Sequence, residues 1–472
     1  MKRRGFIQDT AIALFGGSIF TSLDASSKQS NADGLKKRKE AKNIIFLVSD
    51  GMSIGTLVMA DLLLQRKEGK RSAWLKLYET GQAKRALMDT ASASSLVTDS
   101  AAASSSWGCG VRVNNGSLNV DPNGEWHRPI WQKFKAKGKK IGVVTTVPVA
   151  HATPAGFCIN NNKRGDMDDI ALQYLSVDID VIMGGGRNNF LESTRTDKAD
   201  LIAKFNARQY DVALDREQMR DLLVSGRSVL GLFDEAALPY ALDRMNDPVK
   251  NKAVPSLAEM AMKSIDLMKG HPKGFVLQIE AGKVDWAAHA NDIGGLLYDQ
   301  IEFDDAVNAV LNFAAKDGET LVIITTDHGN ANPGLFYGGN ANKNFDRIQQ
   351  FKHTNDWMLQ AINKSSTPLQ VRELFHSEQG LVLKEEDAKS IVQHYQNLDE
   401  TGVYNPRKLP FKMLSQLQFE HTSVGWGSMD HSADFVELTM VGPGSELLSP
   451  FVRNTDLHNL MLKAAGVMEH IS

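Results

Sequence analysis

Six short runs of apolar, largely β-branched residues recur along the chain, each bounded by turn-forming residues and separated by segments compatible with helices. They cover residues 43–49, 140–147, 179–183, 275–279, 320–326 and 436–441. Because these runs are continuous rather than alternating, they predict strands that are buried on both faces, as in a largely parallel sheet between helix layers. The pattern therefore predicts a doubly wound α/β fold, which binds ligands beyond the carboxyl ends of its strands.

Length and composition fit an enzyme of ordinary type. A chain of 472 residues can form one large α/β domain with insertions or two domains, and 42% hydrophobic and 23% charged residues are typical of a globular enzyme. The formal net charge of −3 gives no reason to expect nucleic acid or an anionic membrane surface as a partner. The two cysteines, Cys109 and Cys158, exclude a disulfide framework and a cysteine-based zinc site, and the sequence leaves open whether they pair.

The N-terminus has the pattern of a targeting segment. Lys2, Arg3 and Arg4 precede an apolar stretch at 11–23 that is too short to span a bilayer, as in a twin-arginine export signal. We expect a signal peptide at 1–25, a Ser- and Lys-rich linker at 26–42 and a folded domain at 43–472. Export to the periplasm follows from this interpretation, with an extracellular location as the alternative. A basic tail on a cytosolic protein is the competing interpretation.

Polar residues of the types that bind metals or phosphate follow five of the six predicted strands. They are, in chain order, Asp50, His151 with Thr153, the run 184–187, Glu280, and Asp327 with His328. A single acid at a strand end is commonly a turn or cap residue. Acids and histidines at the same end of several strands instead favour a polar site at one edge of the sheet. The GGG run at 184–186 lacks the spacing of a nucleotide-binding motif and is predicted to form a tight turn.

Residues 330–418 differ in composition from the rest of the chain. They contain no apolar strand run, many Asn, Gln and Lys residues, and several amphipathic stretches. We therefore expect a mainly helical insertion between the last two core strands, placed as a lid or cap.

Ser100 follows Thr98 and Asp99 and precedes a run of alanines, which is the pattern of a helix start. Taken alone, the segment is most simply a helix N-cap. The first turn of a helix also stabilises an anionic group, which suits a serine that attacks or carries a phosphoryl group.

The segment from Glu280 to His289 has the spacing of a metal site. If Asp285 opens a helix, Asp285 and His289 at positions i and i+4 share one face, and carboxylate plus imidazole suits zinc. Glu280 could hold a harder ion such as Mg²⁺. A solvated helix turn with a surface Asp–His pair is the alternative.

Two further parts of the chain offer imidazole ligands. Asp327 and His328 are adjacent after a predicted strand, where a turning backbone could direct both side chains to one ion. Near the C-terminus, His421 and His431 are both candidates, and spacing does not decide between them. Together these residues could hold two or three metal ions, with an arginine, Arg164, as the clamp for phosphate oxygens.

These motifs resemble those of the alkaline phosphatase family, from about Lys42 to the C-terminus and most weakly in the insertion. The matching segments are 49–52, 97–102, 151–157, 183–187, 280–289, 326–328, 431–433 and 442–444. The resemblance implies hydrolysis of phosphate monoesters through a phosphoserine at Ser100, with Asp99 orienting Arg164. It also implies two Zn²⁺ ions and one Mg²⁺ ion.

The resemblance assigns ligands to each of these ions. One zinc is expected on Asp285, His289 and His431, and His431 is preferred to His421 because Gly442-Pro443 follows it after the family's interval. The second zinc and the magnesium share one carboxylate. The resemblance implies Asp50, Asp327 and His328 for the second zinc, with Ser100 as its reactive ligand, and Asp50, Thr153 and Glu280 for the magnesium.

His151 and Trp286 occupy positions that vary within the family. Because Trp carries no charge, any further positive charge near the phosphate would come from His151 or be absent. Members are often homodimers, so a homodimer is expected by analogy alone. A phosphodiesterase, a sulfatase, a phosphoglycerate mutase and a non-catalytic binding protein are the alternatives. The sulfatase motif is missing after Ser100, Thr153 and Glu280 argue against a diesterase, and no expected ligand is missing.

Overall fold

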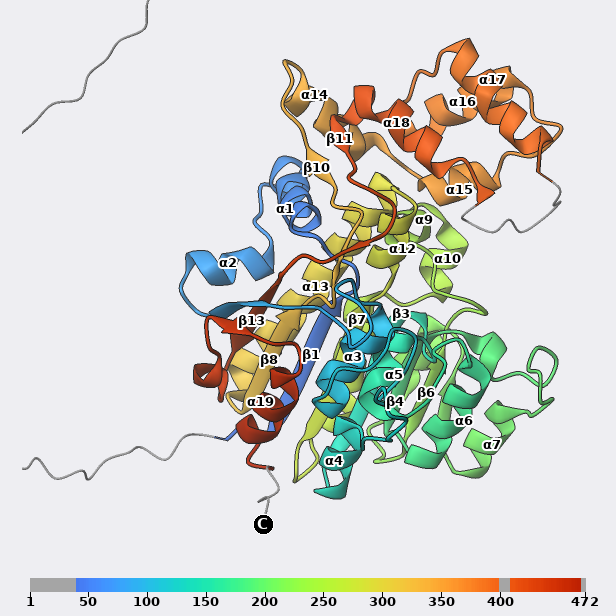
Figure 1. The fold of residues 1–472 in the computed structure, drawn as a ribbon. Coiled ribbons are helices and arrows are strands. Elements are labelled where there is room, and N and C mark those ends of the chain that lie inside the picture. The colour runs from blue at the N-terminus through green and yellow to red at the C-terminus, as the bar shows by residue number, and fades with distance from the viewer. Residues whose placement is uncertain (1–39, 399–407, 468–472) are drawn as a thin grey trace, which may run out of the picture. The chain divides into compact units, whose positions relative to one another are not determined.

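The computed structural model describes residues 40–398 and 408–467, so the predicted signal peptide and most of the predicted linker lie outside the described residues. A ten-stranded sheet forms the centre of the fold (Figure 1), in the order β14-β2-β13-β8-β1-β7-β3-β4-β6-β5. All six predicted runs form strands of this sheet, namely β1 (Asn43–Ser49), β3 (Lys140–Pro148), β4 (Val181–Gly185), β7 (Phe275–Ala281), β8 (Thr320–Thr325) and β13 (Val436–Val441).

Most neighbouring strands are parallel, as predicted. β1 pairs in parallel with both β7 and β8, and β3 pairs in parallel with β7 and β4. β13 is the exception, because it runs antiparallel to β8 and β2. Four short strands of this sheet were not predicted, because their apolar runs are too brief or alternate with polar residues; they are β2 (Lys84–Met88), β5 (Asp211–Ala213), β6 (Val229–Leu232) and β14 (Phe451–Val452).

Each face of the sheet buries a separate apolar core. Ile45 and Leu47 of β1 pack into one core, and Ile44 and Phe46 pack into the other, as the alternation of side chains along a strand requires. The first core is covered by α1 (Ile54–Glu68), α2 (Ala73–Glu79), α11 (Leu257–Met268) and α13 (Ile293–Asp317). The second is covered by α3 (Ser100–Cys109), α4 (Ile130–Ala136), α5 (Ala152–Cys158), α6 (Met167–Val177), α7 (Leu201–Ala207) and α19 (Asp456–Ala464).

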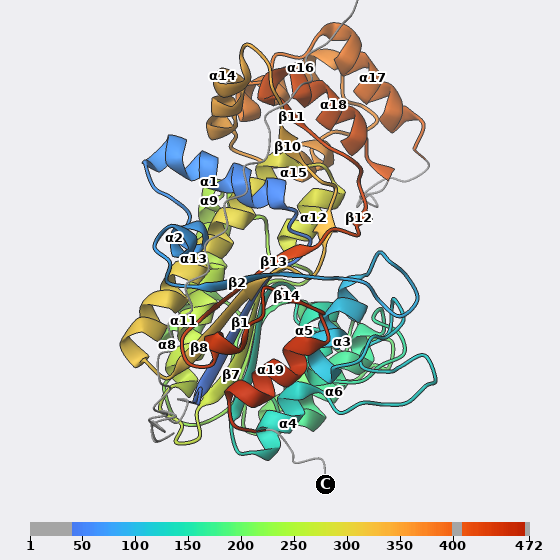
Figure 2. The same ribbon diagram turned by 60° about the vertical axis from the view of Figure 1, so that its left-hand side comes forward.

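Between β8 and β13 the chain forms a group of helices that we call the cap, which comprises the described residues 341–398 and 408–422. Its helices are α14 (Ala341–Asp346), α15 (Asn355–Gln360), α16 (Pro368–Gln379), α17 (Glu385–Gln396) and α18 (Phe411–Thr422). The cap has its own apolar core, which includes Phe375, Tyr395 and Leu414. Both views place these helices together beyond one end of the sheet (Figures 1 and 2). The predicted helical insertion before the last core strand is therefore confirmed.

Short elements complete the described fold. Two antiparallel pairs flank the cap, β10 (Gly334–Leu335) with β11 (Val424–Gly425) and β9 (Gly329–Asn330) with β12 (His431–Ser432). The remaining α-helices are α8 (Arg216–Asp221), α9 (Ala241–Asn246), α10 (Pro248–Ala253) and α12 (Lys283–His289). Within 40–398 and 408–467, none of the helices is both long and apolar enough to span a bilayer. Cys109 and Cys158 are buried free thiols and do not pair.

Candidate active site

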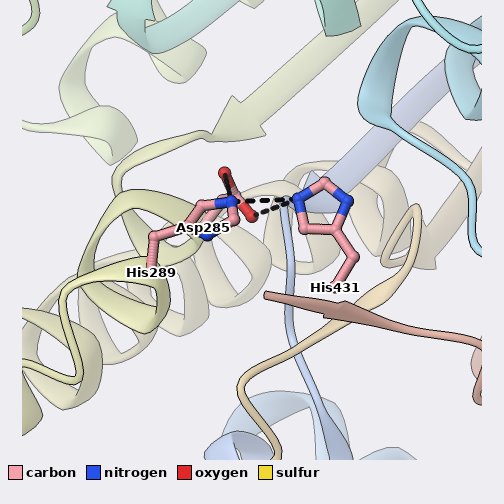
Figure 3. A group of neighbouring side chains, drawn as sticks. All are labelled: Asp285, His289 and His431. Carbon is pink, nitrogen blue, oxygen red and sulfur yellow. Dashed lines mark hydrogen bonds and ion pairs between the residues drawn. The ribbon is translucent and has the colours of Figure 1, made fainter. Parts of the chain in front are cut away.

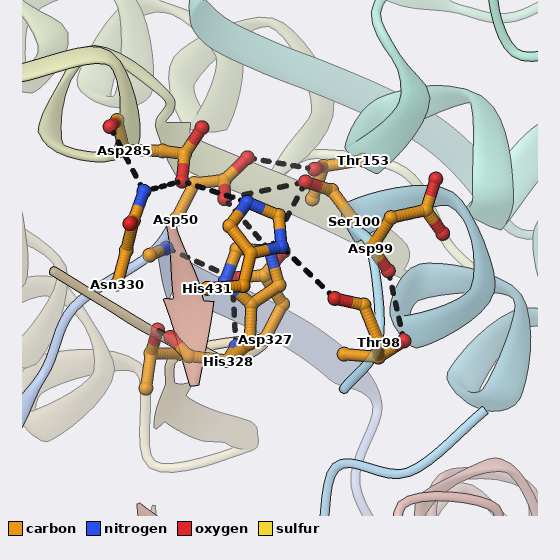
Figure 4. Close-up of polar contacts among 12 residues, drawn as sticks. Asp50, Thr98, Asp99, Ser100, Thr153, Asp285, Asp327, His328, Asn330 and His431 are labelled. Atoms are coloured by element: carbon orange, nitrogen blue, oxygen red, sulfur yellow. Dashed lines mark hydrogen bonds and ion pairs between the residues drawn. The ribbon is translucent and has the colours of Figure 1, made fainter. Parts of the chain in front are cut away.

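Residues from the carboxyl ends of the central strands meet in one buried polar cluster (Figure 4). Asp50 directly follows β1, and Asp327 follows β8 after one residue. Glu280 is the penultimate residue of β7 rather than the residue after it, because its backbone still pairs with Val48 of β1 and Thr145 of β3. Asp50, Glu280 and Asp327 are each at most 1% exposed. The predicted polar edge of the sheet is thus a cluster of buried carboxylates.

Ser100 is the first residue of helix α3 and points into this cluster. The Asp99 side chain caps the helix by accepting a hydrogen bond from the Ala102 backbone N–H at 2.9 Å. Ser100 Oγ lies 3.4 Å from Asp50 Oδ1 and 3.3 Å from His328 Nε2. The segment is therefore a helix N-cap, as its sequence indicates, and it also presents Ser100 to the carboxylates at the positive end of the helix dipole.

Asp285, His289 and His431 form the first group with metal-ligating geometry (Figure 3). His289 Nε2 lies 3.5 Å from Asp285 Oδ2, and His431 Nε2 lies 3.5 Å from Asp285 Oδ1. The Nδ1 atom of His289 is 2.7 Å from the Met429 carbonyl oxygen, and that of His431 is 2.9 Å from the carbonyl oxygen of Thr98. A carbonyl partner for each Nδ1 leaves both Nε2 atoms free to bind a metal ion.

A second group joins Asp50, Asp285 and His328. Asp327 adjoins it, because Asp327 Oδ2 lies 3.1 Å from His328 Nε2 while Asp327 Oδ1 accepts a hydrogen bond from the Gly51 N–H at 3.0 Å. Asp327 Oδ2 is buried and has no hydrogen-bond partner among the described residues. This oxygen is therefore available to a cation.

A third group joins Asp50, His151 and Glu280. Thr153, at the start of α5, donates a hydrogen bond to Asp50 Oδ2 at 3.2 Å. Thr145 of β3, which the sequence did not single out, donates to Glu280 Oε2 at 2.5 Å. Glu280 Oε1 is buried without a hydrogen-bond partner in the described part of the chain. The oxygen atoms of Asp50, Glu280 and Thr153 are donors of the type that Mg²⁺ prefers, and the group also contains the imidazole of His151.

The electrostatics of the cluster favour bound cations. Burial, together with the charge of Asp327, raises the pKa of Asp50 well above its usual range, and burial raises the pKa of Glu280 to about 7. Burial also opposes ionisation of Asp285, yet its hydrogen bond with His431 and the charge of His289 lower its pKa overall. Buried carboxylates without partners are costly unless cations compensate them, so this set of donors fits divalent metal ions.

Arg164 lies at the Ser100 side of the cluster. Its Nη1 donates to Asp99 Oδ2 at 3.0 Å, and its Nη2 lies 3.2 Å from His151 Nε2. Burial and the nearby charge of Arg164 lower the pKa of His151 to about 3. His151 is therefore neutral at physiological pH. It does not supply the further positive charge near the phosphate that the sequence analysis considered.

Trp286 contacts His151, and the buried Lys283 contacts Trp286 in turn. The Trp286 ring meets the His151 ring edge to face, with centroids 6.2 Å apart. Lys283 Nζ lies 4.9 Å from the centroid of Trp286 and 3.6 Å from that of Tyr240. Lys283 is a buried cation that sequence reasoning missed, although its i, i+3 spacing from Trp286 places both residues on one face of α12. The structure also brings His431 rather than His421 into the cluster, since His421 lies at the end of cap helix α18.

Comparisons with known proteins agree with this geometry. The alkaline phosphatase family model matches residues 41–467. Alkaline phosphatase 3 of Bacillus subtilis is 30% identical over 96% of this chain and 96% of its own length, and alkaline phosphatase 4 of the same organism is 29% identical over 96% and 95%. The crystal structure of Thermus thermophilus alkaline phosphatase superposes with a TM-score of 0.84 at 30% identity, covering 94% of this chain and 96% of the other. The chain therefore belongs to the alkaline phosphatase family and is a metal-dependent phosphomonoester hydrolase.

Proposed function

We propose that the protein hydrolyses phosphate monoesters through a phosphoserine formed on Ser100. The observation that carries this proposal is the position of Ser100 Oγ, 3.4 Å from Asp50 and 3.3 Å from His328 at the first residue of α3. The hydroxyl is thereby set among metal-ligating groups and at the positive end of the α3 helix dipole, where an anion is stabilised.

We assign the cluster two zinc ions and one magnesium ion. The proposed ligands are Asp285, His289 and His431 for the first zinc, Asp50, Asp327 and His328 for the second, and Asp50, Thr153 and Glu280 for the magnesium. The unpartnered buried oxygens of Asp327 and Glu280 support this assignment. When bound, such ions supply positive charge that favours an ionised nucleophile and an anionic leaving group.

The residues of the chain divide the reaction between them. Ser100 Oγ attacks phosphorus, its proton is lost, the P–O bond to the alcohol breaks, and the alcohol leaves with a proton from solvent. Water then cleaves the phosphoserine, which releases inorganic phosphate and restores Ser100. Arg164, held by Asp99, is proposed to bind two non-bridging phosphate oxygens as a fork. Because the transition state of phosphoryl transfer is loose, most of the rate comes from this positioning and charge stabilisation.

For the whole chain we propose a signal peptide at 1–25, a linker at 26–42 and a catalytic domain at 43–472 with the insertion at about 330–418. The paired arginines at the N-terminus favour export to the periplasm. A homodimer is proposed by analogy with the family. Phosphate release by chains that begin at residue 26 or at residue 43 tests the proposed bounds of the catalytic domain. The molar mass in solution tests the homodimer.

The central test compares the native chain with Ser100→Ala by release of phosphate from an aryl phosphate monoester at alkaline pH, with zinc and magnesium present. The variant should lose nearly all turnover and keep its zinc, because Asp50, Asp327 and His328 would still hold the ion that Ser100 is proposed to contact. Chelation of the native protein should abolish turnover, and added zinc should restore it. A variant that releases phosphate at the native rate would refute the phosphoserine. A diester substrate serves as a control and should be hydrolysed far more slowly.

A further inference from the structure

A short segment that follows helix α3, residues 113–118, lies between two loops of the candidate site. We call this segment the strap. Its Val113 carbonyl oxygen accepts a hydrogen bond at 2.9 Å from the N–H of Ala93, in the loop that leads to the nucleophile. Its Leu118 N–H donates at 2.8 Å to the carbonyl oxygen of Asn161, in the loop that leads to the arginine. The strap therefore connects the two loops through backbone hydrogen bonds.

Gly116, in the middle of the strap, is bonded to both members of the Asp99–Arg164 pair. Its N–H donates to Asp99 Oδ2 at 3.0 Å, and its carbonyl oxygen accepts from the Arg164 N–H at 2.8 Å. Asp99 Oδ2 also accepts from Arg164 Nη1 at 3.0 Å. The backbone of Arg164 and the partner of its guanidinium are thus attached to one residue of the strap. The geometry of the pair therefore depends on where the strap lies.

Burial does not fix this ion pair. The side chains of Asp99 and Arg164 are 19% and 27% exposed, so water competes for their charges. A partly exposed ion pair contributes little by itself and loses side-chain entropy when it is held in one geometry. Further contacts must therefore hold both partners if the guanidinium is to keep one orientation.

Asn115 holds the strap against the loop in front of Ser100. Its Oδ1 accepts a hydrogen bond from the Asp99 N–H at 3.3 Å, and its Nδ2 donates to the Val97 carbonyl oxygen at 3.0 Å. Its own N–H donates to Ser94 Oγ at 3.0 Å. The amide side chain thus pairs with a C=O and with the N–H two residues further on, as the backbone of a neighbouring strand would.

We propose that Asn115 is a positioning residue for phosphate binding. It fixes the strap against the loop 97–99, and it thereby holds Asp99 directly and Arg164 through Gly116. The inference rests on the proposed function, because it takes Arg164 as the group that binds the phosphate oxygens. Asn115 acts only through these neighbours and has no part in the chemical steps.

The first test measures how strongly inorganic phosphate inhibits hydrolysis of an aryl phosphate monoester by the metal-loaded full chain. Asn115→Ala should raise KM and the phosphate inhibition constant together, by roughly three- to tenfold, and leave kcat within about threefold. Both constants should rise because Arg164 is proposed to contact oxygens that substrate and product share. Asn123→Ala is the matched control, since Asn123 is an exposed asparagine in the same connection between α3 and α4, and it should change neither constant.

A double-mutant cycle shows whether Asn115 acts through Arg164. Arg164→Ala should raise the phosphate inhibition constant by roughly 10- to 100-fold. In that background, Asn115→Ala should change the constant by less than about twofold, because the group that Asn115 positions is already absent. A merely structural role would weaken phosphate binding by the same factor in both backgrounds. Asn115→Ser, whose side chain is too short to bond to both Val97 and Asp99, repeats the cycle if Asn115→Ala does not fold.

An unchanged phosphate inhibition constant in folded Asn115→Ala, or the same factor with and without Arg164, would overturn the inference and leave the proposed function in place. If Arg164→Ala binds phosphate as tightly as the native protein, the proposed role of Arg164 fails, and the role of Asn115 fails with it.

Discussion

Arg164 donates a hydrogen bond through Nη1 to Asp99 Oδ2 at 3.0 Å, and Asp99 is the same residue that caps helix α3 in front of Ser100. Each carboxylate oxygen has its own task, because Oδ1 accepts from the Ala102 N–H while Oδ2 accepts from Arg164 and the Gly116 N–H. One side chain therefore fixes both the start of the nucleophile helix and the proposed phosphate clamp.

Asp99→Asn should separate these two tasks. Asn caps helices about as well as Asp, so the cap of α3 should be kept, whereas the ion pair with Arg164 and the hydrogen bond from the Gly116 N–H are lost. We expect KM for a phosphate monoester and the inhibition constant of inorganic phosphate to rise together, by about tenfold, as a loosened charge-assisted contact implies. Steady-state kinetics and thermal melting measure both effects. Asp99→Ala is the comparison and should also destabilise the fold by about 1 kcal/mol. Unchanged phosphate inhibition in Asp99→Asn would contradict the clamp.

The close packing of α3 on α5 leads to a second prediction. A Cβ atom added at Gly156 would lie 2.2 Å from Ser104 Oγ and 2.6 Å from Ser104 Cβ, so the two helices would have to move apart. Gly156→Ala should therefore destabilise the protein by about 1–3 kcal/mol and lower activity, because α3 carries Ser100 and α5 carries Thr153. Gly165→Ala is the control, since an added Cβ there meets no atom within 4 Å. Denaturant unfolding measures the difference, and equal stability of the two variants would refute it.

The fold was predictable from the sequence where complete burial of a strand produces a continuous run of apolar residues. Strands such as β1 and β8 are buried on both faces, so their continuous apolar runs identify them. By contrast, β2 has the burial pattern of a half-exposed strand, with Ala86 and Met88 buried and their neighbours exposed, and it was missed. β5, with only three residues, is too short to give any periodic signal.

The candidate site was predictable as a set of residue types, but not in its contacts. The strand-end acids and His328 could be named because parallel strands bring their carboxyl ends to one edge. The residues around His421 and His431 do not show which of the two is the metal ligand. The choice of His431 depended on its interval to Gly442-Pro443. Thr145 and Lys283 were missed because their roles depend on neighbours from other parts of the chain, Glu280 for Thr145 and Tyr240 for Lys283.

A third prediction concerns pH. Asp292 caps α13 by accepting a hydrogen bond from the Gly295 N–H, and it also accepts one from the N–H of Asp356 in the cap. Burial, which outweighs these hydrogen bonds, raises its pKa from 3.8 to about 7. A carboxyl group whose pKa is raised on folding contributes stability below its unfolded pKa, and this contribution is lost as pH rises toward the folded pKa. Native stability should therefore contain a falling component between about pH 4 and pH 7.

Asp292→Asn should remove that component. Asn keeps an oxygen that can cap α13 but does not ionise, so stability should fall less steeply with rising pH between about pH 5 and pH 7 than it does in the native protein. Urea unfolding at several pH values measures the slope. Asp356→Asn is the comparison variant for the pH profile. Burial also raises the pKa of Asp356, but Asp356 does not cap α13. Parallel profiles for native protein and Asp292→Asn would contradict the assignment.

The last prediction addresses the third ion. Among the described residues Glu280 Oε1 has no hydrogen-bond partner, while Oε2 accepts a hydrogen bond from Thr145, so Oε1 is available to a cation beside Asp50. Glu280→Gln keeps the shape and the contact with Thr145 but removes the charge. We expect the variant to retain both zinc ions, to lose magnesium and to lose about 10–100-fold in kcat/KM, the usual effect of changes around a metal site. Metal analysis after dialysis, together with activity titrated against Mg²⁺, measures this. Thr153→Ser, which preserves the hydroxyl, is the matched control and should keep its magnesium. Full magnesium occupancy in Glu280→Gln would show that the ion binds elsewhere.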